Sequence, residues 1–321
     1  MKHHVITSRD GPWCGYADSA AMLLSAIGEH VPAGRIEALT GMGFGAFASR
    51  RGMPFFSGLT SEPDIGISKA MDILGFSFDE WACAKGDATD PFERLATALE
   101  HSPAVIGPVD MAHLVYNPVR PQVEGNDHYV LILGLDGDEV HLHDPAGYAH
   151  AIIDRASLER AWRADSISYK RGFYRLWSNP RRVSLPSADD IYRKAMSFFV
   201  MLYHEAEERS QRLNRPIDKQ AILALAALVG EARLTDQQIG HLTQLVLPFG
   251  VKRALDYVLF FKDRHKRLSA LMQEKGEALG RCQSLIMRQD WADAGAILTQ
   301  LASLEEAIKT EVLATAVSGS K

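Results

Sequence analysis

The chain has 321 residues, of which 46% are hydrophobic and 23% are charged, and its 35 Lys and Arg against 40 Asp and Glu give a formal net charge of −5. These proportions are typical of a folded globular protein, and the length suggests two domains. The mild acidity argues against a nucleic-acid-binding protein, which usually carries a basic excess or a basic stripe.

The first half of the chain mixes helical and strand-like patterns. The helical segments are 14–28, 64–75 and 90–101, and the strand-like runs are 103–110, 128–145 and 172–178. Glycine ends the first two helical segments, and Asp90-Pro91 is a typical helix start. Within 128–145, Asp136-Gly137-Asp138 predicts the turn of a hairpin. One early helix followed by an antiparallel sheet indicates an α+β domain over residues 1–182.

The second half of the chain consists almost wholly of amphipathic helical patterns, which predict an all-α domain over residues 183–321. The expected helices are 188–213, 217–232, 236–247, 251–279 and 290–316. Ser187 is a candidate cap for the first of them, and Pro216 and Pro248 are expected to interrupt the series. A packing or dimerisation domain is the interpretation that we favour, so a homodimer through this domain is one expected partner.

Cys14 stands at the expected start of the first helix. A thiol in that position is close to the positive end of the helix dipole and to unpaired backbone N–H groups, which favour the thiolate. Its own N–H is also placed to contribute to an oxyanion hole. The alternative is an inert, buried cysteine. Cys83 and Cys282 complete an odd, widely spaced set, which predicts neither a disulfide framework nor a thiolate zinc site.

His128 and Asp144 lie at the same end of the predicted hairpin, at the start of its first strand and the end of its second. We expect Asp144 to accept the Nδ1–H of His128, which fixes the tautomer and stabilises the imidazolium. Together with Cys14 they supply a nucleophile, a base and an orienting carboxylate. Each has a structural alternative: a histidine satisfied at a strand start, and an Asp-Pro turn.

Two segments resemble a known class of enzymes. Residues 11–27 and 125–145 are similar to the two catalytic blocks of papain-like cysteine enzymes, above all the bacteriocin-processing peptidases and their non-peptidase relatives. The resemblance implies a papain-like fold in which Cys14 is the nucleophile, His128 the base and Asp144 the orienting residue.

One position departs from that pattern. The peptidases usually carry a glutamine six residues before the cysteine, and its amide completes the oxyanion hole. Ser8 stands at that position here, so its hydroxyl or a nearby backbone amide is the candidate second donor beside the N–H of Cys14. The substitution argues against peptide hydrolysis, but a papain-like peptidase or amidase is kept as the alternative function. A binding module on an inactive scaffold is a third interpretation.

A narrower resemblance covers roughly residues 10–180. The segments 41–56, 105–118 and 157–162, with the hairpin, are similar to the butirosin biosynthesis protein H family, in which a papain-like domain is often followed by a helical one. The resemblance implies a cysteine acyltransferase of specialised-metabolite biosynthesis. The acyl group would pass from a carrier-protein thioester or a small thioester through acyl-Cys14 to an amine, forming an amide. It implies no bound cofactor, although the substrate would carry phosphopantetheine on the acyl carrier protein.

Candidate substrate-binding residues are Phe44 in the glycine-rich loop 41–47, Asp110 and Tyr116. The loop lacks the Lys-Ser/Thr of a phosphate-binding loop, so close packing explains its glycines better. Asp110 either pairs with an ammonium group of the acceptor or caps the end of a strand.

An acidic carrier protein would need a basic surface on an enzyme of net charge −5. The adjacent arginines at 50–51 and at 181–182 are the candidates, and the alternative is that exposed arginines have no specific role.

Residues 1–13 lack the apolar stretch of a secretory signal, and the most apolar run, 221–230, is too short to span a bilayer. We therefore expect a cytoplasmic protein without a membrane partner. His141 and His143 share one face of a predicted strand but have no clear third ligand, so no metal site is predicted.

Overall fold

The computed structural model describes residues 15–50, 52–87, 89–120 and 124–318. They fall into two compact units: the first holds the chain up to Ile36 together with Glu62–Pro186, and the second holds Glu37–Ser61 together with the chain from Ser187 onward. Within the described residues, none of the helices combines the length and the apolar character that crossing a membrane requires.

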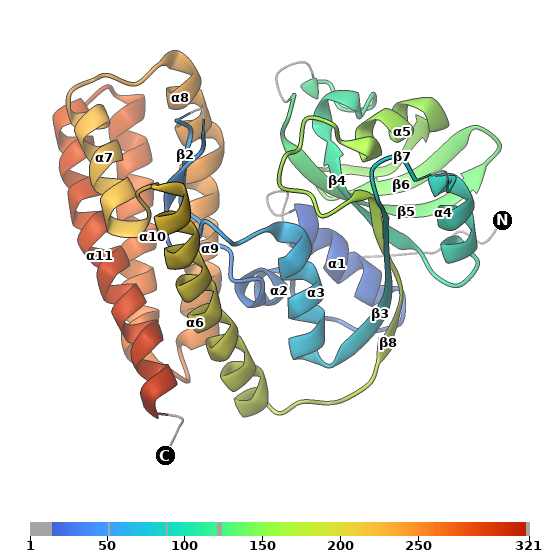
Figure 1. Cartoon of the computed structure of the whole chain (residues 1–321), viewed down its shortest axis with the longest axis horizontal. Helices are drawn as coiled ribbons and strands as arrows, with labels where there is room; N and C mark the ends of the chain where they lie inside the picture. Colours follow the sequence, from blue (N-terminus) through green and yellow to red (C-terminus); the bar gives the residue numbers. More distant parts are fainter. Residues whose placement is uncertain (1–14, 51, 88, 121–123, 319–321) are drawn as a thin grey trace. The chain divides into compact units, whose positions relative to one another are not determined.

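The first unit is a mixed α/β structure built on one antiparallel sheet (Figure 1). Its helices are α1 (Gly15–Ser25), α3 (Pro63–Leu74), α4 (Pro91–Leu99) and α5 (Arg155–Arg163), and α2 (Ala33–Leu39) crosses the division between the units. Its strands are β3 (Phe76–Cys83), β4 (Ala104–Asp110), β5 (Asp127–Asp136), β6 (Glu139–Asp144), β7 (Tyr148–Asp154) and β8 (Phe173–Arg182). The strand order is β3-β8-β4-β5-β6-β7.

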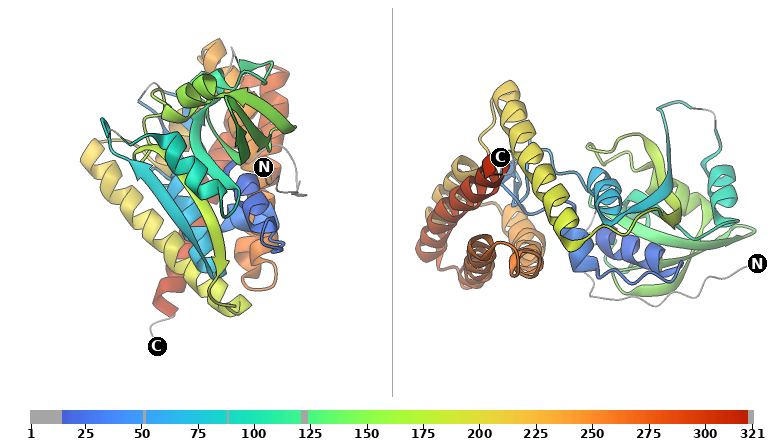
Figure 2. Two further views of the ribbon diagram at one scale, coloured as in Figure 1. Left: turned by 90° about the vertical axis from the view of Figure 1, so that its right-hand side faces the viewer. Right: turned by 90° about the horizontal axis from the view of Figure 1, so that it is seen from below.

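Both faces of this sheet are covered by helices. Ile106 of β4 lies opposite Val130 and Leu176, and all three are buried in one core with residues of α4 and α5. Because successive side chains of a strand point to opposite faces, the residues next to them face the other way. There the ring of Tyr129 contacts Tyr16 of α1. Figures 1 and 2 show α1 and α3 on this face and α4 and α5 on the other.

Local signals set the bounds of several elements as the sequence predicts. Gly75 ends α3 in the left-handed region, with φ 82°. Asp90 caps α4 by accepting the N–H of Phe92. The hairpin turns at Gly137 and the residue after it, so that Asp136 pairs with Glu139. These contacts confirm the predicted helix ends and the turn between β5 and β6.

The second unit is helical, which confirms the expected all-α character of the C-terminal region. Its helices are α6 (Ala188–Leu213), α7 (Asp218–Gly230), α8 (Asp236–His241), α9 (Leu247–Phe261), α10 (Lys266–Met287) and α11 (Trp291–Ser318), with a π-helical turn, Leu242–Val246, and two short strands, β1 (Phe47–Ala48) and β2 (Pro54–Phe55). Pro248 does not break the series: α8, the π-helical turn and α9 follow one another without a gap, and Pro248 lies in the first turn of α9. The expected helix 251–279 is instead interrupted between α9 and α10.

The compact units depart from the expected division into 1–182 and 183–321 at residues 37–61, here called the inserted segment. The backbone of this segment is bound by side chains of the surrounding helices. Lys275 Nζ donates to the carbonyl of Gly43 over 2.7 Å, Glu305 Oε1 accepts the N–H of Gly45 over 2.5 Å, and the Tyr257 hydroxyl donates to Met42 O over 2.9 Å. The sequence pattern alone assigns this glycine-rich segment to the domain of its neighbours in the chain. The long-range contacts assign it instead to the second, helical unit.

Phe44, an expected substrate-binding residue, is part of that core. It is 3% exposed, and its ring lies 4.4 Å from that of Tyr257 and 4.7 Å from that of Phe199, centroid to centroid. The flanking glycines allow this insertion: Gly45 has φ 78°, and a Cβ there would lie 2.6 Å from Asp218 Oδ1. The structure therefore gives Phe44 a packing role.

Removing one partner of the buried Lys275–Glu305 ion pair should strongly destabilise the second unit. The paired atoms are 2.6 Å apart and the two side chains 2% and 0% exposed. Lys275→Ala leaves a buried carboxylate without its cation, so we expect the free energy of unfolding to fall by about 3–5 kcal/mol in urea denaturation.

The neighbouring residue supplies the control. Glu306 pairs with Lys219 over 2.5 Å, with side chains 57% and 43% exposed, so Lys219→Ala should cost no more than about 1 kcal/mol. Equal losses in the two variants would show that burial of the first pair does not matter.

Candidate functional site

The hairpin of β5 and β6 brings His128 and Asp144 into direct contact. Nε2 of His128 lies 2.6 Å from Oδ1 of Asp144, and the two residues are only 7% and 2% exposed. The predicted pairing is therefore present, but through the other ring nitrogen. The expectation that Asp144 accepts from Nδ1 is wrong, because the end of β6 reaches the far edge of the ring.

The Nδ1 edge of the ring faces the start of α1. A Cβ built on Gly15 would lie 2.6 Å from Nδ1 and 2.7 Å from Cε1 of His128. Any other residue at this position would displace the ring, so glycine is required by this close approach. The two expected residues on the preceding stretch, Cys14 and Ser8, lie outside the described residues.

The pair is electrostatically coupled. Burial lowers the pKa of His128, but the charge of Asp144 and the hydrogen bond to it outweigh burial, so the net pKa is raised above its ordinary value of 6.5. Burial raises the pKa of Asp144, and the charge of His128 together with three hydrogen bonds lowers it below 3.8. Both shifts favour an imidazolium beside a carboxylate.

Asp144 has two further donors. The N–H of Ala146 donates to Oδ1 over 2.7 Å, and the hydroxyl of Tyr116 donates to Oδ2 over 2.9 Å. Tyr116 thus lies beside the His128–Asp144 pair, but its hydroxyl is hydrogen-bonded within the protein and does not point toward a substrate. No sequence pattern indicates this contact, because Tyr116 lies in an irregular loop 28 residues before Asp144.

Asp110 has the capping role that the alternative interpretation predicts. It is 3% exposed, and Oδ1 accepts the N–H groups of Ala112 over 2.9 Å and of Gly125 over 3.2 Å. Oδ2 accepts the hydroxyl of Ser166. These bonds tie together the loops on either side of the end of β4.

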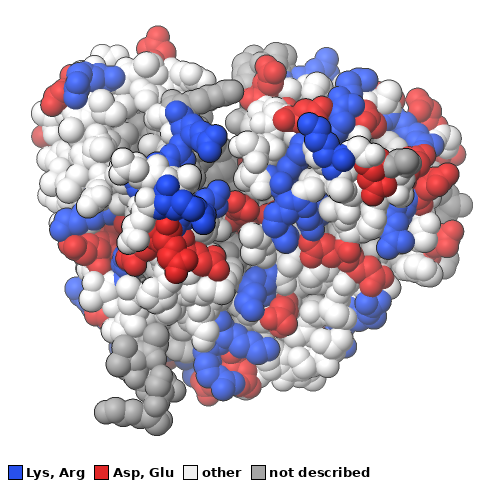
Figure 3. All heavy atoms as spheres, in the orientation of Figure 1, with Lys and Arg blue, Asp and Glu red and all other residues white. Residues whose placement is uncertain are grey.

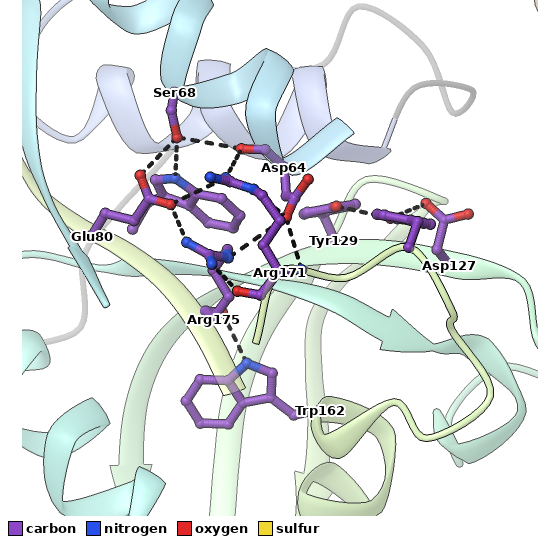
Figure 4. A network of polar contacts seen from close by, with 10 residues as sticks. Asp64, Ser68, Glu80, Asp127, Tyr129, Trp162, Arg171 and Arg175 are labelled. Carbon is purple, nitrogen blue, oxygen red and sulfur yellow. Dashed lines mark hydrogen bonds and ion pairs between the residues drawn. The ribbon is translucent and has the colours of Figure 1, made fainter. Parts of the chain in front are cut away.

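A second polar network, which the sequence does not indicate, fixes the loop before β8 (Figure 4). Arg171 Nε donates to the buried Asp64 Oδ2 over 2.9 Å. In the same loop, the Tyr169 hydroxyl donates to Asp127 over 2.9 Å and lies 3.0 Å from the hydroxyl of Tyr129. The network therefore holds both neighbours of His128 along β5.

The remaining cysteines of the chain are poor nucleophiles. Cys83 and Cys282 are buried, and burial raises the pKa of both thiols, that of Cys282 to about 12. Among the described residues, no three His, Cys, Asp or Glu side chains gather in a way that would hold a metal ion.

The described structure is thus a mixed α/β unit with a buried His–Asp pair at one hairpin, joined to a helical unit. Over 304 residues, the sequence of this chain is 35% identical to that of a Bacillus subtilis strain 168 protein named uncharacterized protein YobF. The match covers 95% of this chain and 97% of that protein. Residues 213–313 match the family model described as the YobF C-terminal domain. The chain belongs to the YobF family.

The electrostatic coupling predicts the titration of His128. By NMR we expect its pKa above 6.5 in the wild type and below 6.5 in Asp144→Asn, because the mutant ring stays buried without the compensating charge. The stabilisation that His128 gives is complete below about pH 6.5 and is lost as the pH rises through its raised pKa. The stabilisation from Asp144 is present above about pH 4 and is lost as the pH falls through its lowered pKa. An unchanged His128 pKa in Asp144→Asn would contradict the coupling.

Proposed function

We propose that the first unit is a papain-like cysteine acyltransferase in which Cys14, His128 and Asp144 form the catalytic triad. The observation that carries the proposal is the orientation of His128: Nε2 is bound to Asp144, and Nδ1 lies against Gly15. Cys14 is covalently joined to Gly15, so the chain connectivity supports a nucleophile–base pair between its thiol and Nδ1.

In the first step, the Cys14 thiolate attacks the carbonyl carbon of a thioester. The carbon–sulfur bond to the donor breaks, and the proton on Nδ1 of His128 passes to the departing thiolate, leaving acyl-Cys14 and a free donor thiol. The positive end of α1 favours the oxyanion that forms on the way. The N–H of Cys14 is the proposed first donor and Ser8 the position of the second.

In the second step, an amine attacks acyl-Cys14. Its nitrogen forms the amide bond, one of its protons passes to Nδ1 of His128, and the sulfur of Cys14 leaves as the thiolate that began the cycle. Asp144 stays ionised throughout and stabilises the imidazolium. Water in place of the amine would make the same parts a hydrolase, so exclusion of water decides the outcome.

The resemblance to the butirosin biosynthesis protein H family supports transfer rather than hydrolysis. It extends over the segment 41–56, although in this structure that segment belongs to the helical unit. The serine at position 8 in place of the glutamine of the peptidases also favours transfer.

The decisive measurement is the intact mass of the protein after incubation with a panel of small acyl thioesters. We expect the wild type to gain the mass of one acyl group, Cys14→Ala to gain none, and added primary amines to discharge the adduct at least tenfold faster than water. His128→Ala should slow the formation of the acyl adduct by about 100-fold or more.

The other outcomes separate the alternatives. Discharge by water as fast as by amine would overturn transfer in favour of hydrolysis. The absence of any adduct, with a Cys14 that alkylates no faster than a free thiol, would overturn the proposal that this site is catalytic.

An acidic carrier protein as donor would need a basic surface on this protein. The two arginine pairs differ in their surroundings. Arg181 is bound to Asp79 over 2.8 Å and Arg182 to Glu29 over 2.5 Å. Arg50 instead lines an open pocket of the helical unit at the C-terminal end of α6, where basic and acidic side chains lie side by side (Figure 3). The residues lining it are Arg50, Thr60, Glu205, Glu208, Arg209, Arg212 and Leu213. We propose this pocket as the carrier-docking surface; Arg51 lies outside the described residues.

Charge reversal tests the docking surface. Arg50→Glu combined with Arg212→Glu should raise KM for a carrier-bound acyl group by roughly tenfold at low salt and leave KM for a small thioester unchanged. The matched control is Arg193→Glu with Lys194→Glu, which reverses two charges at the other end of α6. An equal rise in KM for both substrates, or the same effect in the control, would refute the surface.

A further inference from the structure

We propose that Tyr116 is a positioning residue for the site: its hydroxyl fixes the second oxygen of Asp144 and thereby holds the imidazole of His128 with Nδ1 toward Gly15. The effect of Tyr116 on catalysis rests on the proposed function. Its effect on the Asp144 carboxylate does not depend on that proposal.

The two oxygens of Asp144 are bound differently. Oδ1 accepts from His128 Nε2 over 2.6 Å and from the Ala146 N–H over 2.7 Å, whereas the hydrogen bond to Oδ2 within the described part of the chain comes from Tyr116, over 2.9 Å. The Asp144 side chain is 0% exposed. Water therefore does not replace a lost donor, and a carboxylate oxygen without a partner is costly.

Tyr116 is itself held by a fixed loop. A 3₁₀ turn, Met111–His113, begins at Asp110, and the N–H of Asn117 then donates to the carbonyl of the fully buried Leu114 over 2.8 Å. Asn117 is 1% exposed, and its Oδ1 accepts the N–H of Val119 over 3.0 Å within the same loop. The loop therefore presents the phenol in one place, which is the requirement for a residue that orients another.

A phenol suits this position because it is a neutral donor. Burial, together with the charge of Asp144, raises the pKa of Tyr116 above its ordinary value of 10, so it stays protonated and keeps donating. A cation at the same place would compete with His128 for the carboxylate. The hydroxyl instead stabilises the charge of Asp144 and leaves the imidazolium as its counter-ion.

Other charged and titratable groups also face the pair. These are Asp127 from β5, Asp18 from α1 and Tyr148 from β7. Tyr148 provides a matched control, because it pairs with Asp144 across β6 and β7 and its ring lies 5.5 Å from that of Tyr116, yet its hydroxyl donates to Asn117 rather than to the carboxylate.

The experiment compares Tyr116→Phe with Tyr148→Phe, each of which removes one hydroxyl and keeps the ring. The Asp144 carboxyl and the His128 ring are titrated by NMR in the full chain. We expect Tyr116→Phe to raise the pKa of Asp144 by about one unit or more, since a hydrogen bond to a charged group is lost. Tyr148→Phe should leave it within about 0.3 units.

Acylation kinetics distinguish a positioning role of Tyr116 from a merely structural one. Tyr116→Phe should lower the rate of Cys14 acylation about tenfold without changing KM, and should move the acid limb of its pH profile upward. In an Asp144→Asn background the same substitution should have no further effect, because the residue acts through the carboxylate.

Two results would overturn the inference: an Asp144 pKa unchanged in Tyr116→Phe, or the same shift in Tyr148→Phe, which would assign the effect to packing of the loop. Failure of the proposed function is distinguishable, because a protein that no thioester acylates still gives the carboxyl titration.

Discussion

The site depends on one constraint, the burial of the Asp144 carboxylate. A carboxylate excluded from water is stable only when donors satisfy its oxygens and a counter-charge lies close by. Here the donors come from β5, from the turn after β6 and from the loop after β4. All three have to be in place together, and their common result is a His128 ring fixed with one edge against the start of α1.

The helical unit follows the same physical principle with different residues. Lys275 and Glu305 are buried as a pair, and both also bind the backbone of the inserted segment, 37–61. The match to the YobF C-terminal domain covers 213–313 and so contains both charges but not the segment that they bind. In this chain, a segment from early in the sequence thus completes the polar interactions of the C-terminal core.

Predictions from the sequence succeeded where a short stretch contains both the pattern and its end signal. The hairpin of β5 and β6 is one case, and the helix that starts after Asp90 is another. They missed β3 and β7, which form the two edges of the sheet and are partly exposed, so neither shows a clean apolar alternation. They did not indicate that Phe44 packs in the helical unit, because a glycine-rich loop carries no information on which core receives it.

By itself the sequence determined the local elements that carry their own end signals, and with them the pairing of His128 with Asp144, since a two-residue turn brings the ends of a hairpin together whatever surrounds it. Only the tertiary structure decided which ring nitrogen Asp144 binds, that Tyr116 donates to its other oxygen, and that residues 37–61 belong to the helical unit. Each of these depends on contacts between segments distant along the chain, made because buried polar groups must find partners wherever the fold supplies them.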